Sequence, residues 1–440
     1  MEWWKKRRII LPLAVLALFF PGNVRGGMET PGGHDTALAG QAAVDGSRTV
    51  TLAELVREAL EKNPAIQASH YAASAKKAMI ESAQTLPDPV LGFQQMGDIN
   101  PPGLQRGDPS SGRTYSITQE VPFPGKLDLK GKIAETEFDA ETWNQQQTRL
   151  QVIADLKVAY FNLYLVDHHI TLLEENKKLL QQFASTAESR YRVGQGIQQD
   201  VLKAHVEISK LIDRLTVLEQ RRAATEEEIN SLLYRPPGTP LGKPGAVTKA
   251  EFPYPYNQLY ELARSHYPLL QVQEQEIQRN LHRVELARRE FYPDFALGLS
   301  AVERSGLSEM YGIMVNAKVP LYFWRKQQPE LSSATMSLDS ARKQRDNTTA
   351  RLNARVKDLY LTATTSERLA ELYRNGVIPQ ARLALESAVA AYQVGNIDFL
   401  AVLDSFFTLL DYEMKYFEVF TEFHKALAQL EPYTGLELVQ

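Results

Sequence analysis

The sequence contains one pattern twice, about 200 residues apart, and this duplication constrains the fold more than any other feature. In residues 191–202 and 392–403, a Tyr, a Val, a Gly and a later Val-Leu pair keep the same spacing. Further pairs follow in the same order: Asn63-Pro64 with Tyr267-Pro268, Leu86-Pro87-Asp88 with Tyr292-Pro293-Asp294, and Val121-Pro122 with Val319-Pro320. Solenoid modules repeat every 20 to 50 residues or so, which is far shorter. The pattern therefore predicts two halves related by pseudo-symmetry.

The first residues predict a secretory signal. Basic residues from Lys5 to Arg8 precede an apolar stretch, Ile9 to Phe20, which Pro21-Gly22 ends. The stretch is short for a spanning helix, which needs about 20 apolar residues, although an uncleaved anchor is the alternative. We expect a signal peptide at 1–27 and a flexible N-terminal segment at 28–50.

Composition excludes several classes of site. The chain has no cysteine, which removes disulfides, thiolate metal sites and a lipid anchor on an N-terminal Cys. The net charge of -4 gives no indication of nucleic-acid binding. No later apolar run approaches spanning length, so we expect any membrane contact to involve amphipathic strands.

The first half, residues 51–233, predicts a helix, two strands, a long helix, a turn and another helix. Thr51 and Glu54 form a capping-box pattern at the first helix, and Pro64 marks an early break. In the second strand, larger side chains alternate with Thr and Ser at a period of two, as expected for a sheet with two different faces. The long helix of about 65 residues would extend roughly 97 Å. The elements are expected at 51–84, 90–96, 113–121, 126–190 and 198–233, with the turn at 194–196.

The second half, residues 256–431, repeats this order after a Pro-rich connector at 234–255. Gly376 and Pro379 lie inside the second long helix, where proline should kink it. Pro432 is expected to close the last helix and to begin a C-terminal tail, 432–440. The expected elements are helix 256–290, strands 295–302 and 310–319, helix 325–391, turn 395–396 and helix 397–430.

These elements predict a mainly α fold with a small membrane β part. A helix this long without a globular partner indicates a coiled coil or a helical barrel. Four strands cannot close a barrel, which needs roughly eight or more, so a membrane-spanning sheet requires oligomerisation. The alternative is a small soluble sheet capped by helices. The aromatic residues near the strand ends fit a membrane-interface girdle: Phe123, Phe291, Tyr292, Tyr322, Phe323 and Trp324.

Over about residues 50 to 435, the chain resembles the TolC family of outer-membrane efflux proteins. The resemblance is carried by the two turn segments and by Leu52-Ala53-Glu54-Leu55, Asn63-Pro64, Leu86-Pro87-Asp88-Pro89 and Gln119–Gly125. It implies a homotrimer, a 12-stranded β-barrel in outer-membrane lipid and a 12-helix tunnel in the periplasm. It also implies two partners, a periplasmic adaptor (membrane fusion) protein and an inner-membrane transporter of the RND type. Residues 378–382 are similar to the branch that serves heavy-metal resistance pumps of the cobalt-zinc-cadmium or copper type.

The resemblance places an acidic tunnel entrance, or gate, at the turns. In the family, two Asp three residues apart line this entrance; here Asp404 matches one and Ala401 the other. Asp398 could supply the missing carboxylate, and Asp200 is equivalent to Ala401 in the first half. Rings of carboxylates favour cations. The alternative is that Asp398 and Asp200 only stabilise helix N-termini through the helix dipole.

The two turns are also the expected docking site for the adaptor, because they are the most exposed repeated feature of the helical hairpins. The alternative is that Tyr and Val pack the turn and Gly provides a left-handed cap. The candidate docking residues are Tyr191, Val193, Gly194, Tyr392, Val394 and Gly395.

No pattern predicts an enzyme, a cofactor or a metal site. The only adjacent histidines, His168-His169, lie mid-helix with rings about 100° apart, and nucleophile-elbow, phosphate-loop and dinucleotide motifs are missing. The predicted function is an outer-membrane exit duct for heavy-metal cations or drugs. The alternatives are an exit duct for secreted polypeptides and a periplasmic coiled-coil adaptor or scaffold without a channel.

Overall fold

The computed structural model describes residues 49–99 and 102–439, so the predicted signal peptide lies outside the described residues. Most of the predicted flexible segment lies outside them too, but its last two residues do not. Thr49–Val50 form strand β1, which pairs in parallel with β6 (Lys243–Pro244). The Val50 carbonyl also accepts hydrogen bonds from Gly245 N at 3.1 Å and Tyr160 Oη at 3.3 Å. The prediction that the flexible segment extends to residue 50 was therefore wrong, because the backbone of Thr49 and Val50 pairs with β6.

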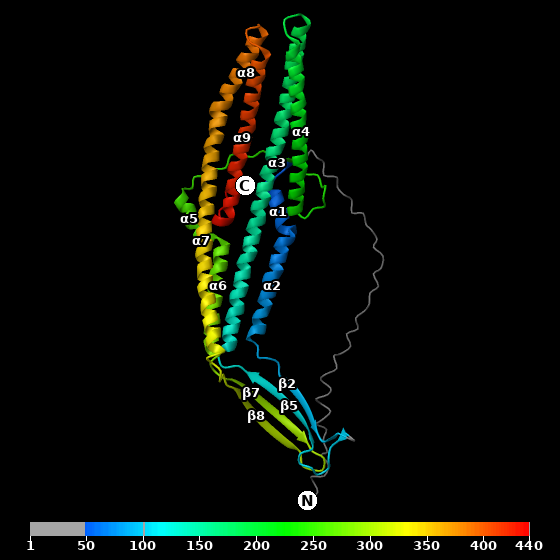
Figure 1. The fold of residues 1–440 in the computed structure, drawn as a ribbon, viewed down its shortest axis with the longest axis vertical. Coiled ribbons are helices and arrows are strands. Elements are labelled where there is room, and N and C mark those ends of the chain that lie inside the picture. The colour runs from blue at the N-terminus through cyan, green and yellow to red at the C-terminus, as the bar shows by residue number, and fades with distance from the viewer. Residues whose placement is uncertain (1–48, 100–101, 440) are drawn as a thin grey trace. The chain divides into compact units, whose positions relative to one another are not determined.

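The helices of the first half are α1 (Leu52–Lys62), α2 (Pro64–Gln84), α3 (Lys126–Arg192) and α4 (Gln198–Leu232) (Figure 1). Thr51 caps α1 as predicted, its hydroxyl accepting from Glu54 N at 3.4 Å. Asn63 sits at the break before Pro64 and accepts from Ala65 N at 2.9 Å. Its amide also donates to Leu232 O at 2.8 Å, which ties this break to the end of α4.

The second half contains α5 (Tyr256–His266), α6 (Pro268–Arg289), α7 (Gln327–Leu372), α8 (Ile378–Gln393) and α9 (Phe399–Thr434). The single helix predicted over 256–290 is two helices, because the residue before Pro268 is extended, as at Pro64. The predicted kink near Gly376 is a π-helical segment, η1 (Tyr373–Val377). Pro432 does not close α9; Gly435, at φ 70°, does.

Four antiparallel strands form one sheet in the order β2-β5-β7-β8. They are β2 (Val90–Met96), β5 (Gly112–Val121), β7 (Asp294–Glu303) and β8 (Met310–Lys318). The central β5–β7 pairing joins the two halves of the sequence. A separate small hairpin, β3 (Asp98–Ile99) with β4 (Pro102–Gly103), follows β2. The sheet adjoins the ends of α2, α3, α6 and α7, at the opposite end of the helices from the turns (Figure 1).

Helix α3 is the central element of the helical layer. It has 67 residues, about 100 Å at 1.5 Å per residue. It packs against α2 and α6 towards the sheet and against α4 and α9 towards the turns, while α7 packs on α6 and α9. One apolar core surrounds Phe161 and Phe423, and a second surrounds Leu180 and Phe406 nearer the turns. Within the described residues, no helix combines the length and apolar character needed to span a membrane.

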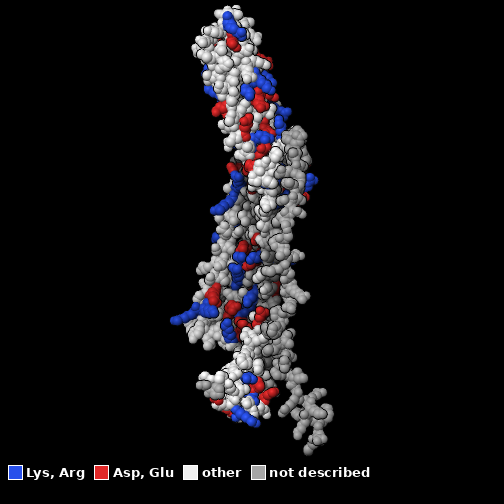
Figure 2. Space-filling model, turned by 90° about the vertical axis from the view of Figure 1, so that its right-hand side faces the viewer, with Lys and Arg blue, Asp and Glu red and all other residues white. Residues whose placement is uncertain are grey.

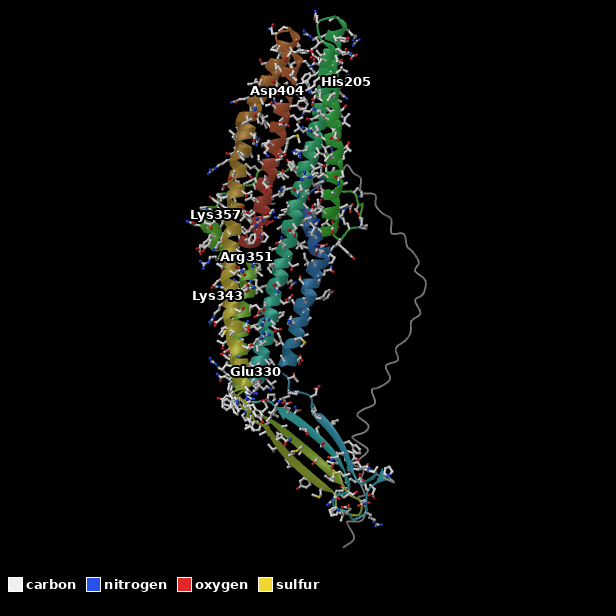
Figure 3. The ribbon with its side chains drawn as sticks, in the orientation of Figure 1. His205, Glu330, Lys343, Arg351, Lys357 and Asp404 are labelled. Atoms are coloured by element: carbon white, nitrogen blue, oxygen red, sulfur yellow. The ribbon has the colours of Figure 1, made fainter. Side chains whose placement is uncertain are left out.

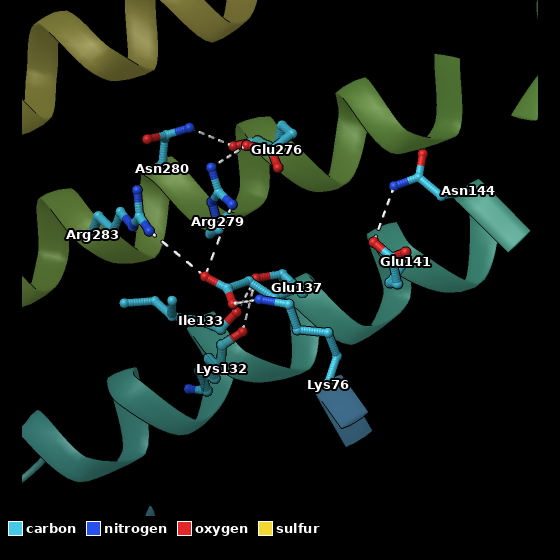
Figure 4. A network of polar contacts seen from close by, with 11 residues as sticks. Lys76, Lys132, Ile133, Glu137, Glu141, Asn144, Glu276, Arg279, Asn280 and Arg283 are labelled. Carbon is cyan, nitrogen blue, oxygen red and sulfur yellow. Dashed lines mark hydrogen bonds and ion pairs between the residues drawn. The ribbon is translucent and has the colours of Figure 1, made fainter. Parts of the chain in front are cut away.

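A network around Glu137 ties α2, α3 and α6 together near the sheet (Figure 4). Lys76 Nζ lies 2.8 Å from one carboxylate oxygen of Glu137, and Arg283 and Arg279 lie 3.6 and 3.8 Å from the other. Arg279 is itself paired with Glu276. The Lys76 contact is the main reason that the pKa of Glu137 is lowered. The Glu137 carboxylate of α3 thus contacts basic side chains of both α2 and α6.

Candidate functional site

The register of the sheet separates an apolar face from a mixed face, on which polar and small residues lie together with Met310 and Met314. One row across the four strands is Leu91–Ile117–Leu299–Ile313, and the next row is Gly92–Ser116–Ser300–Gly312. The apolar row is exposed, with Ile313 74% accessible. Further members of the exposed apolar face are Phe93, Tyr115, Phe295, Leu297, Tyr311 and Val315. A sheet with an exposed apolar face and a more polar opposite face has the pattern of a membrane barrel wall.

The sheet ends in two strands without a neighbour in the described chain. β2 and β8 are the outermost strands of its order, so their outer backbone groups have no strand partner there. Unpaired edges carry a high free-energy cost in hydrocarbon, where water cannot replace the missing hydrogen bonds. A sheet of this kind can enter lipid only when further strands complete it.

The structure brings the six predicted interface aromatics to the junction between sheet and helices. Phe123 and Tyr292 stack at 4.6 Å between ring centroids, and Phe291 lies 6.5 Å from Phe323. Tyr322 and Trp324 are 70% and 57% exposed. Their contact with a membrane remains a prediction.

A buried lysine joins the two halves at this junction. Lys126 is 2% exposed, and its ammonium lies 2.9 Å from both Glu290 and Asp294. Asp294 also accepts from Phe123 N at 2.8 Å, and Arg289 donates to Pro124 O at 2.7 Å. Sequence reasoning missed this cluster, because its partners lie more than 160 residues apart.

At the far end of the helices, Arg190 connects the two turns. Its Nη1 donates to Tyr392 O at 2.7 Å and Gln393 O at 2.9 Å, the carbonyls at the end of α8. Its guanidinium lies 4.9 Å from the centre of the Tyr392 ring, and Nη2 donates to Gln195 O at 3.4 Å. Sequence reasoning missed Arg190 as well. The available signal was that Ala391 stands at the equivalent position of the second copy.

The three predicted acids lie near these turns in different roles. Asp398 is the N-cap of α9 and accepts from Ala401 N at 2.9 Å, which is the kind of contact that the alternative, a role at the helix N-terminus, requires. Asp200 lies in the first turn of α4, where burial and then the Asp398 carboxylate raise its pKa. Asp404 is exposed on α9, and its side chain makes no ion pair or hydrogen bond within the described residues (Figure 3). An entrance role for the three acids remains a prediction.

The candidate docking residues divide by exposure. Tyr191, Val193 and Val394 are 45%, 69% and 71% exposed. Tyr392 is only 7% exposed, because its ring packs on Phe399 at 5.5 Å and beneath Arg190. The expectation that Tyr392 contacts an adaptor is therefore wrong for this conformation. The glycines have the left-handed conformation of a cap: Gly194 at φ 73° and Gly395 at φ 83°.

The histidine pair contributes to packing. The His168 ring lies 4.0 Å from that of Tyr164, and His169 Nε2 lies 3.2 Å from Met414 O on α9. Among residues 49–99 and 102–439, no group of three or more His, Asp and Glu residues is placed to hold a metal ion. Figure 2 shows side chains of both charges interspersed along the helices on one face.

The fold and the two-faced sheet define a class of internally duplicated helical-hairpin proteins with a small four-stranded sheet. The chain belongs to the outer membrane efflux protein family, whose model matches residues 55–233 and 259–436, once for each half. The cobalt-zinc-cadmium resistance protein CzcC of Cupriavidus metallidurans is 20% identical over 438 residues, 98% of this chain and 100% of CzcC.

Solved structures of similar fold include the outer-membrane channel OprN, with a TM-score of 0.75 and 18% identity. The alignment covers 87% of this chain and 89% of OprN. CusC, described for its folding and transmembrane channel formation, has a TM-score of 0.74 and 16% identity. That alignment covers 87% of this chain and 91% of CusC. At these identities the structures establish the fold, which is mainly α with a small β part.

Proposed function

We propose that this chain is the outer-membrane exit duct of a tripartite efflux system. Three copies would contribute four strands each to a closed barrel in outer-membrane lipid, with the helices forming a periplasmic tunnel. The observation that carries this proposal is the sheet: an exposed apolar row, Leu91–Ile117–Leu299–Ile313, beside a polar row and between two unpaired edges. Membership of the family supports the assignment.

The proposed cargo is heavy-metal cations, with drugs as the second candidate. The name of the relative CzcC, a cobalt-zinc-cadmium resistance protein, supports this class. Asp200, Asp398 and Asp404 near the turns would form carboxylate rings in a trimer, and such rings favour cations. The pump would select the cargo and supply the energy, so we assign no catalytic role to this chain.

The turns are the proposed contact with a periplasmic adaptor and, through it, an RND-type inner-membrane transporter. Val193 and Val394 are exposed apolar residues at equivalent positions of the two turns. Arg190 would hold these turns together in the closed state, because it bonds to carbonyls of the opposite hairpin. Gate opening would then require this contact to break.

The test is planar-bilayer conductance of the detergent-purified protein, together with its mass in detergent. We expect a trimer with small cation-selective currents, and reduced cation selectivity in Asp404→Ala. A water-soluble monomer without currents would overturn the proposal in favour of a periplasmic scaffold. Large, weakly selective currents in the presence of a polypeptide-secreting pump would favour the secretion duct.

A further inference from the structure

The segment between β8 and α7, residues 318–326, exposes an apolar run between basic residues. Lys318 precedes it, and Arg325-Lys326 follow it. The run contains Val319, Leu321, Tyr322, Phe323 and Trp324, each between 49% and 70% exposed. It continues directly from β8, whose Tyr311, Ile313 and Val315 belong to the apolar face of the sheet. We call residues 318–326 the junction segment.

The junction segment is ordered by its own contacts. Arg325 N and Lys326 N both donate to Tyr322 O, at 2.9 and 3.1 Å, and Gln328 N donates to Phe323 O at 2.8 Å. The Trp324 ring lies 5.2 Å from Phe323 and 6.2 Å from Tyr322, measured between centroids. The rings and the two bases are thus held on one tight turn that leads into α7.

The bases of this turn have no acidic partner in the described chain. Arg325 and Lys326 are exposed, and neither side chain makes an ion pair or hydrogen bond with a described residue. The nearby acids Glu290 and Asp294 are bound to Lys126 at 2.9 Å. Glu330, in the first turn of α7, makes no ion pair there either. Two cations therefore remain beside an exposed aromatic cluster.

We propose that the junction segment binds an anionic phospholipid, and this inference rests on the proposed membrane function. Aromatic rings favour the boundary between acyl chains and headgroups, where Tyr322, Phe323 and Trp324 would lie. Arginine recognises phosphate through paired N–H groups, and lysine adds a second charge. The occupant is a headgroup with net negative charge, such as phosphatidylglycerol, and not a zwitterionic lipid.

Trp324 supplies the reporter for a direct test. The chain has four tryptophans, so a W3F/W4F/W143F variant retains Trp324 alone. The protein would be reconstituted in phosphatidylcholine with equal fractions of brominated phosphatidylglycerol or brominated phosphatidylcholine, which quench tryptophan fluorescence on contact. Each base near an anionic surface is worth about 1 kcal/mol, or about fivefold in binding. We therefore expect the brominated anionic lipid to be at least about fivefold enriched at Trp324.

The matched variants are R325Q/K326Q and K343Q/R351Q in the same single-tryptophan background. Both remove two positive charges, but Lys343 and Arg351 lie further along α7 (Figure 3). We expect the lipid preference to fall below about twofold only in R325Q/K326Q, with its conductance unchanged. Equal quenching by brominated phosphatidylglycerol and brominated phosphatidylcholine in the W3F/W4F/W143F protein would overturn the inference and leave the channel proposal standing. Absence of quenching together with absence of conductance would defeat both.

Discussion

Arg190 lies at the end of α3, in the first hairpin. It connects the two hairpin turns of one chain because its guanidinium donates to backbone carbonyls of the second hairpin. Hydrogen bonds from a charged group contribute about 1.5–3 kcal/mol each. If Arg190→Gln removes about 2 kcal/mol from the closed state, the open fraction rises roughly 30-fold. We expect larger single-channel conductance or open probability in Arg190→Gln. Arg192→Gln, an exposed neighbour in the same helical turn, is the control. Equal currents in both variants would exclude Arg190 as a closing contact.

The buried side chain of His424 should make the stability of the folded protein depend on pH. It is fully buried, its Nδ1 lies 2.8 Å from Phe420 O, and its Nε2 accepts from Ala250 N at 3.3 Å. Burial lowers its pKa in the folded state, with Lys249 adding a smaller effect. Below pH of about 6.5 the unfolded chain takes up this proton more readily than the folded chain. Stability should therefore fall on acidification below that pH.

Thermal unfolding in detergent between pH 7.5 and 4.5 measures this effect. His424→Gln should be less stable at pH 7.5, by about 1–3 kcal/mol, because a buried polar contact is lost. Its unfolding midpoint should then fall less steeply towards pH 4.5 than that of the parent. His169→Gln should show the same weaker dependence on pH, because burial lowers the pKa of His169 as well. Parallel curves for parent and His424→Gln would contradict the prediction.

At the scale of elements, the two hairpin turns provide a matched comparison. Gly194 and Gly395 share a left-handed backbone, so Gly→Ala costs each about 1 kcal/mol in strain. A Cβ at Gly194 would meet nothing within 4 Å, whereas one at Gly395 would lie 3.5 Å from Arg190 Nη2. We expect both variants to lose similar stability. A separation of 3.5 Å is an ordinary van der Waals contact, so the added methyl group leaves room for Arg190 and neither variant should change the conductance. Thermal unfolding measures the loss of stability, and a much larger loss in one variant than in the other would argue against equal backbone strain.

Local signals in the sequence predict most of these elements, because proline, glycine and strand alternation act within a few residues. Thr51, Pro64 and the turn glycines were interpreted correctly on this basis. Pro268 was not, although it has the same backbone effect, because apolar helical periodicity continues past it. The contacts of Lys126 and Arg190 required the pairing of the two halves, which sequence spacing alone does not specify.

For the whole molecule, the two faces of the sheet lead us to expect opposite effects of lysine substitutions at neighbouring residues. Leu299 lies in the exposed apolar row and Ser300 in the polar row beside it. A lysine facing lipid near the bilayer centre costs about 2–4 kcal/mol, so Leu299→Lys should reduce the yield of membrane-inserted trimer. A lysine facing the lumen avoids that cost.

Ser300→Lys should therefore insert normally and instead lower cation selectivity, because three symmetry-related lysines would line the barrel. Membrane fractionation with native gel electrophoresis measures insertion, and bilayer reversal potentials measure selectivity. Normal trimer yield for Leu299→Lys together with failed assembly for Ser300→Lys would mean that the faces are reversed. Normal assembly and unchanged selectivity in both would mean that this sheet does not span a membrane. The same pair of variants thus tests both the orientation of the sheet and its proposed environment.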